Sequence, residues 1–218
     1  MSQIQIEIGA QTITLVQMPA TPGFADVQLT ASDTVGSTRS PFTGQTQTQS
    51  WPGADFWGGT VTLPPLTRMQ SAQWTSFLMQ LRGMSNAFML SDPLALTPQG
   101  RPQGTPVANT AGATGNNAAM TTTLFTRGWK ANAFRLLLPG DNVQVGFRLH
   151  RVLDQVNSDA NGDASINIWP SLREVPVDAS PIILNNPAGL FRLAKNDRIW
   201  QISNAFITTM SFQVTEYR

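Results

Sequence analysis

The chain has 218 residues, of which 41% are hydrophobic and only 12% are charged, and its formal net charge is +1. It contains no cysteine and a single histidine, which excludes disulfides, thiolate zinc sites, cysteine nucleophiles and clusters of imidazole ligands. Its basic residues are dispersed rather than clustered, so we expect no specific nucleic-acid binding. Neutral polar residues must therefore cover most of the surface. Such a surface does little to keep molecules apart, which favours a subunit that packs against copies of itself.

Targeting and membrane signals are missing from the pattern. Residues 1–9 do not place a basic stretch before an apolar one, as a signal peptide would. No apolar run approaches the ~20 residues that cross a bilayer. We therefore expect a soluble product, made in a cytoplasm and without a membrane partner.

The N-terminal part reads as β structure. Apolar and polar residues alternate strictly over 3–8, which predicts a half-buried strand followed by a turn at Gly9-Ala10. The same reasoning predicts strands through Ile13 and Leu15, through Val27 and Leu29, over residues 55–63 and, more briefly, over 86–90.

One predicted strand is polar on both faces. Residues 45–50 read QTQTQS, and burial specifies the position of such a strand only weakly. A contact between subunits and an exposed edge strand are both compatible with this pattern. The candidates for an oligomer interface are Gln45, Thr46, Gln47, Thr48 and Gln49.

A helix is predicted over 67–82. Thr67 and Gln70 have the spacing of a capping box, and Gly83 is placed to end the helix. Apolar residues follow at the spacing of one helical face, at Trp74, Phe77, Leu78 and Leu81. We expect this face to cover the N-terminal sheet.

The composition changes after the helix. Proline and glycine are dense over 92–117, which predicts a domain boundary with extended loops. Beyond it, alternating residues at 143–147 and a hairpin of residues 150–156 and 164–169 predict a small β-barrel or sandwich. The chain ends on a further alternating strand through residues 210–214. We therefore predict a second domain over 98–203, inserted between 1–97 and 204–218 of the first.

No residue pattern indicates catalysis. His150 has Asp141 and Asp154 as candidate orienting groups, but no GxSxG motif accompanies it, and we expect a structural histidine. The acidic residues do not single out a carboxylate pair either. We predict that the chain is not an enzyme and has no catalytic, cofactor-binding or metal-binding residues.

An acidic turn resembles the start of a calcium loop. Asp159, Asn161 and Asp163 alternate, but Ala164 and Pro170 stand where that loop needs Gly and Glu. The flanks also predict strands instead of helices. We interpret the segment as an Asx-rich hairpin turn and leave cation binding open.

Short motifs run along most of the chain. The first half has SPFTGQTQ at 40–47, WPG at 51–53 and LPPL at 63–66, and then the predicted helix and residues 88–93. The second half has PQGTP at 102–106, RGW at 127–129, LPGD at 138–141, IWP at 168–170 and GLFRLA at 189–194. Their order resembles the tail-tip structural proteins of siphophages, and the chain is similar in size and layout to distal tail proteins.

The resemblance implies a mainly β fold, with a split β-barrel "belt" domain, one covering helix and a second small β-barrel or sandwich domain. It implies a homohexameric ring in the virion, at the tail tip, that joins the tail tube protein to the baseplate hub and the fibre proteins. No active-site residues come with the family.

Two other functions stay open. The second domain could bind oligosaccharide, or contact the host surface as another baseplate or minor tail protein does. Its candidate stacking residues are Trp129, Trp169 and Trp200, although tryptophan is more often buried in a core. A tail-associated hydrolase is the other alternative.

Overall fold

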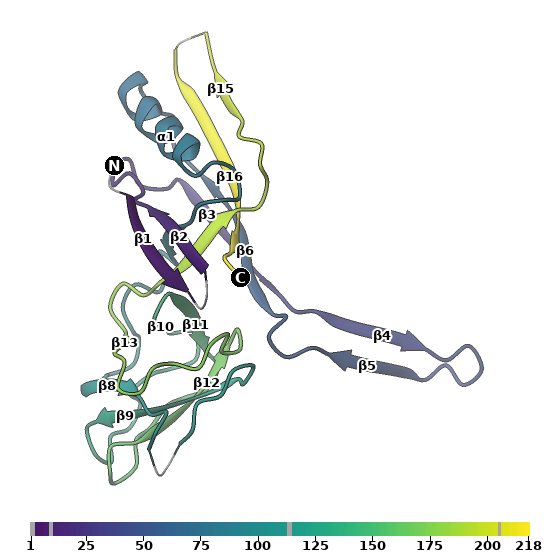
Figure 1. The fold of residues 1–218 in the computed structure, drawn as a ribbon, viewed down its shortest axis with the longest axis vertical. Helices are drawn as coiled ribbons and strands as arrows, with labels where there is room; N and C mark the ends of the chain where they lie inside the picture. Colours follow the sequence, from purple (N-terminus) through teal and green to yellow (C-terminus); the bar gives the residue numbers. More distant parts are fainter. Residues whose placement is uncertain (1–2, 9–10, 113–114, 205) are drawn as a thin grey trace. The chain divides into compact units, whose positions relative to one another are not determined.

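The protein is mainly β, with 45% of its residues in strands. We describe a computed structural model that covers residues 3–8, 11–112, 115–204 and 206–218. Within those ranges it has one helix, and no helix is long and apolar enough to cross a membrane. Figure 1 shows the strands and the helix in chain order.

The chain forms two compact units. One consists of Met1–Thr30, Trp57–Leu96 and Asn186–Arg218, and the other of Ala31–Phe56 and Thr97–Asn185. The sequence placed the second domain at 98–203 instead. Two differences follow from long-range pairing, because residues 31–56 bond to the second unit and residues 186–203 pair with strands of the first.

The first unit is built on an antiparallel sheet in the order β3-β6-β16-β14-β7. Its strands are β3 (Asp26–Ser32), β6 (Phe56–Thr62), β16 (Thr208–Glu216), β14 (Ala188–Leu193) and β7 (Phe88–Ser91). β15 (Trp200–Ile202) pairs with the first half of β16. The predicted final strand is confirmed as β16, in which alternate residues from Thr208 to Glu216 are buried.

A two-stranded hairpin of β1 (Gln3–Ile8) and β2 (Gln11–Val16) belongs to the same unit. Backbone bonds from Val16 to Ala87 and from Ala87 to Thr14 join β2 to the chain just before β7. Both strands were predicted, and the turn predicted at Gly9-Ala10 lies outside the described residues.

The predicted helix is confirmed as α1 (Arg68–Gln80). Oε1 of Gln70 accepts the backbone N–H of Thr67 at 3.0 Å, as a capping box requires. Trp74 and Phe77 pack edge to face at 5.7 Å, and Phe77 meets Phe88 of β7 at 5.5 Å. Trp74 also lies 6.2 Å from Phe212 of β16, so α1 packs on the sheet at β16 and β7 and covers it as expected.

The second unit contains a nearly closed antiparallel barrel of six strands. The strand order is β13-β10-β11-β12-β9-β8. The strands are β8 (Gly104–Ala108), β9 (Thr123–Trp129), β10 (Asn142–Val145), β11 (Arg148–Val152), β12 (Ala164–Trp169) and β13 (Ile182–Ile183). The predicted small barrel is therefore confirmed, but its last strand ends at Ile183, because β14 and β15 pair in the other sheet. β8 and β9 lie where loops or no strands were predicted.

The two end strands of the barrel approach each other through the segment before β13. The N–H of Ala108 donates to the carbonyl of Ser180 at 2.8 Å. Asp178 reinforces this junction, since its carboxylate accepts the N–H groups of Thr110 and Ala111 and pairs with Arg127 at 2.7 Å. Hydrogen bonds from Ala111 and Arg127 lower the pKa of Asp178 to about 2.

Candidate interaction sites

The strand predicted at 45–50, which is polar on both faces, lies in an exposed hairpin of the second unit. β4 (Val35–Arg39) pairs with β5 (Thr46–Ser50), and each pairs with no other described strand. All five residues of β5 are exposed. The strand predicted over 45–50 is thus confirmed, while its role as a subunit interface stays a prediction. Thr46, Gln47, Thr48 and Gln49 lie on β5, and Gln45 lies just before it in the hairpin loop (Figure 1).

The loop of this hairpin is ordered by its own hydrogen bonds. The N–H of Ser40 donates to Gln45 O at 2.9 Å, and the N–H of Gly44 donates to Ser40 O at 3.0 Å. Gly44 has a φ of +71°, which glycine adopts without strain. Phe42 is 96% exposed in this loop. An aromatic side chain held at an exposed loop is suited to contact another molecule.

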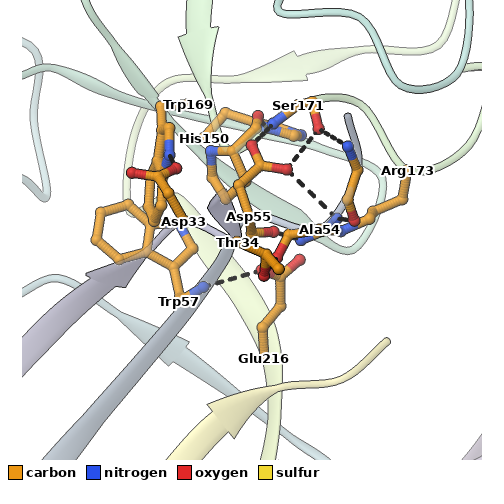
Figure 2. A network of polar contacts seen from close by, with 12 residues as sticks. Asp33, Thr34, Ala54, Asp55, Trp57, His150, Trp169, Ser171, Arg173 and Glu216 are labelled. Carbon is orange, nitrogen blue, oxygen red and sulfur yellow. Dashed lines mark hydrogen bonds and ion pairs between the residues drawn. The ribbon is translucent and has the colours of Figure 1, made fainter. Parts of the chain in front are cut away.

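A buried polar network anchors the base of the hairpin to the barrel. Asp55 accepts the N–H of Ser171 at 2.5 Å and its hydroxyl at 2.7 Å. Arg173 lies 3.6 Å from Oδ1 of Asp55 and also donates to the carbonyl oxygens of Gly53 and Asp55. Figure 2 shows these groups converging on Asp55. Because both carboxylate oxygens are engaged below the surface, the network fixes where the hairpin leaves the barrel.

A second contact lies beside this network. Nε1 of Trp169, at the end of β12, donates to Oδ1 of Asp33 at 2.8 Å, just before β4 (Figure 2). The hydroxyl of Thr34 donates to Ala54 O at 3.0 Å. Both chains of the hairpin are therefore held at the base.

His150 lies in the same region and is buried. Its Nδ1 lies 2.7 Å from the carbonyl oxygen of Pro170, so this nitrogen is the protonated one. Nε2 is buried and has no hydrogen-bond partner among the described residues. Burial, and more weakly Arg173 and Arg148, lower the pKa of His150 to about 4.

The two carboxylates proposed to orient His150 accept hydrogen bonds from other groups. Asp141 accepts the N–H groups of Gln99, Gly100 and Leu138 at the turn before β10. Asp154 accepts a hydrogen bond from Asn167 at 2.7 Å. The hypothesis of a catalytic arrangement around either carboxylate is therefore not supported by this geometry, and a structural role for His150 fits it better.

The acidic turn at 159–163 is closed by hydrogen bonds to the side chain of Asp159. Oδ1 of Asp159 accepts the N–H groups of Asn161 and Asp163, each at 2.8 Å. This is the Asx-rich turn that we predicted. In the described part of the chain, no group of three or more His, Asp or Glu side chains is placed to hold a metal ion.

Comparison with protein-family models finds no match to this chain. A comparison with curated proteins finds no match either.

A groove lies where the hairpin base meets the barrel within the second unit. It has a volume of about 550 Å³. Trp51, Trp169, Asp33 and Met120 line it, together with the three threonines at 121–123. Trp51 follows β5 directly and is 48% exposed.

The three tryptophans predicted as stacking residues lie in three different parts of the structure. Trp129 belongs to the barrel core, and its Nε1 donates to Thr126 at 2.8 Å. Trp200 lies on β15 in the first unit. Only Trp169 lines the groove, and its companion Trp51 was missed because it stands in a segment that we did not assign to the second domain.

An exposed apolar cluster lies on the hairpin of β15 and β16 in the first unit. We call it the β15–β16 cluster, and it consists of Ile199, Trp200, Ile202, Phe206 and Ile207. Ile202 is 62% exposed and Phe206 is 82% exposed. The second domain predicted from the sequence extends to residue 203, but among the described strands β15 pairs with β16 of the first unit, and its Trp200 and Ile202 side chains are exposed.

Proposed function

We propose that the chain is a structural subunit that assembles with copies of itself through exposed β-hairpins. We further propose that the assembly is the tail tip of a tailed phage, with this chain in the position of a distal tail protein. The motif order described above supports the second statement. The observation that best supports self-assembly is the exposed β15–β16 cluster.

The β15–β16 cluster is suited to bind protein. All of its apolar side chains fall within residues 199–207, on or beside the paired strands β15 and β16. Groups of exposed apolar side chains are characteristic of protein–protein contacts, and they would favour aggregation in a free monomer. We infer that they become buried when subunits meet.

The β4–β5 hairpin supplies a contact of another kind. The residues of β5 are neutral and polar on both faces, and β4 and β5 pair with no other described strand, which leaves their outer backbone edges unpaired. Such edges pair readily with strands of another chain, and the side chains at 46–49 add hydrogen bonds without a net charge to neutralise.

Two different contact surfaces suit a closed ring. A head-to-tail contact joins one surface of a subunit to another surface of its neighbour, and a suitable rotation closes such contacts into a ring. In the proposed virion the ring joins the tail tube protein to the baseplate hub and fibre proteins. The ring is assembled in the cytoplasm of the bacterial host, and hexameric symmetry is the expectation that the resemblance supplies.

The test is the mass of the assembly in solution. We expect Phe206→Lys to lower the mass of wild-type particles toward that of a monomer, because it places a charge in the β15–β16 cluster. Leu94→Lys is the matched control, since Leu94 is 95% exposed but lies outside the cluster. Sedimentation velocity measures both. Equal masses for the two variants and the wild type would refute the role of the cluster.

A further inference from the structure

The groove at the hairpin base has two aromatic walls. Trp51 comes from the end of the hairpin and Trp169 from the end of β12. Each indole is held in place. A Cβ atom at Gly36 would lie 2.7 Å from Cη2 of Trp51, so the indole packs directly against the β4 backbone. Trp169 is held by its hydrogen bond to Asp33.

The polar groups of the groove are uncharged or acidic. Thr34, Ser50 and Thr122 bring exposed hydroxyls, and Asp33 brings an exposed carboxylate. No lysine or arginine is among its lining residues. This composition disfavours phosphate and other anions, which bind where positive charge is concentrated.

These features define a class of ligand. A volume of about 550 Å³ is within the range of ordinary small-ligand sites. The ligand needs flat apolar faces for the indoles and hydroxyl groups for the surrounding donors and acceptors, and it needs no negative charge. Pyranose rings have this combination, because their C–H groups pack on an aromatic face while their hydroxyls point to the sides.

We propose that this groove binds a neutral oligosaccharide, with one sugar ring packed on Trp51 and a neighbouring ring near Trp169. Asp33 accepts a sugar hydroxyl and also orients Trp169. The site requires no other subunit, so it does not depend on the proposed assembly. It lies at the hairpin base, where residues of the segment 33–55 line it together with residues of the segment 98–203 that the sequence singled out for sugar binding.

The experiment is calorimetric titration of the full chain. The probes are neutral hexasaccharides of glucose, galactose, mannose, rhamnose and N-acetylglucosamine, and a sialic acid hexamer is the anionic control. We expect at least one neutral hexasaccharide to bind and Trp51→Ala to weaken it by about tenfold or more. Phe134→Ala is the matched control, because it removes an exposed aromatic ring from the same unit but outside the groove and should leave binding unchanged.

A second variant is needed because Trp51→Ala could weaken binding by loosening the hairpin instead of by removing a sugar contact. Thr122→Arg fills the groove from an exposed position on the barrel and should abolish binding while the hairpin keeps its Trp51 contact. Failure of every neutral hexasaccharide to bind the wild type would overturn the proposal. So would binding that both groove variants leave intact, or tighter binding of the sialic acid hexamer. A fall in assembly mass on Trp51→Ala without any sugar binding would identify the groove as a subunit contact instead.

Discussion

Asp55 and Ser171 are 116 positions apart, yet the carboxylate of Asp55 accepts both the backbone N–H of Ser171 at 2.5 Å and its hydroxyl at 2.7 Å. This pair joins the β4–β5 hairpin to the end of β12. A two-stranded hairpin is at best marginally stable alone, so its position depends on such an anchor.

Asp55→Ala should release the hairpin base. It removes the carboxylate that accepts the N–H and the hydroxyl of Ser171 and that pairs with Arg173, which costs about 3 kcal/mol of unfolding free energy. Hydrogen exchange should accelerate at the backbone amides of residues 33–54. Asp26→Ala is the control, because Asp26 is exposed and lies in the first unit. Equal exchange rates in wild type and Asp55→Ala would show that the network does not hold the hairpin.

His150 should make stability depend on pH between 4 and 6.5. Its pKa is about 4 in the folded chain against an ordinary 6.5, so protonation favours the unfolded chain. The stability that the neutral His150 ring contributes is fully present above pH 6.5 and is lost as the pH falls toward 4. The gap between the two pKa values corresponds to about 3 kcal/mol of unfolding free energy.

Arg148, Arg173 and Asp55 are the charged groups that act on His150. Denaturant titrations at several pH values, with His150→Gln alongside, measure the contribution of the ring. The variant should lose less stability than the wild type between pH 6.5 and 4. Parallel pH profiles would contradict the assigned neutral state.

Gly59→Ala should destabilise the first unit. A Cβ atom there would lie 2.3 Å from the carbonyl oxygen of Gln28, which forces β3 away from β6. We expect a loss of about 2 kcal/mol or more in the free energy of unfolding, measured by urea titration. Gly58→Ala is the neighbouring control, since the nearest atom to its Cβ is 3.8 Å away. Similar losses for the two variants would show that the close approach is not the cause.

Thr46→Pro should disrupt assembly while the rest of the fold remains stable. Thr46 pairs with Arg39, and proline removes a backbone N–H from the hairpin ladder. The particle mass should fall, whereas the melting temperature should stay close to that of the wild type because β5 has no buried residue. Thr46→Ala keeps the N–H and should assemble normally. Intact particles with Thr46→Pro would exclude β5 from the interface.

Local signals predicted much of the first unit. The capping box at Thr67 and the apolar face of α1 determine the helix, since both depend on neighbours within two turns. Alternation likewise predicted β1, β2 and β16. The exposed strand β5 was also predicted, although a strand that is polar on both faces does not indicate what contacts it.

Contacts between residues far apart in the sequence could not be predicted from local patterns. Ile202 alternates with polar neighbours as a core strand would, but among the described strands β15 pairs with β16 alone, and the Ile202 side chain is exposed. β14 belongs to the sheet of the first unit and not to the barrel, because its partners are β7 and β16. Asp55 has no local feature that indicates an anchor, because its partner Ser171 stands far along the chain. β8 contains Pro106 in a proline-rich region, which concealed a strand.

The central claim is that exposed β-hairpins drive self-assembly, and negative-stain microscopy of the purified wild-type chain, with its mass in solution, tests this claim most directly. The account predicts closed rings of one size, with six-fold symmetry as the resemblance implies. A strict monomer at every concentration tested would contradict it.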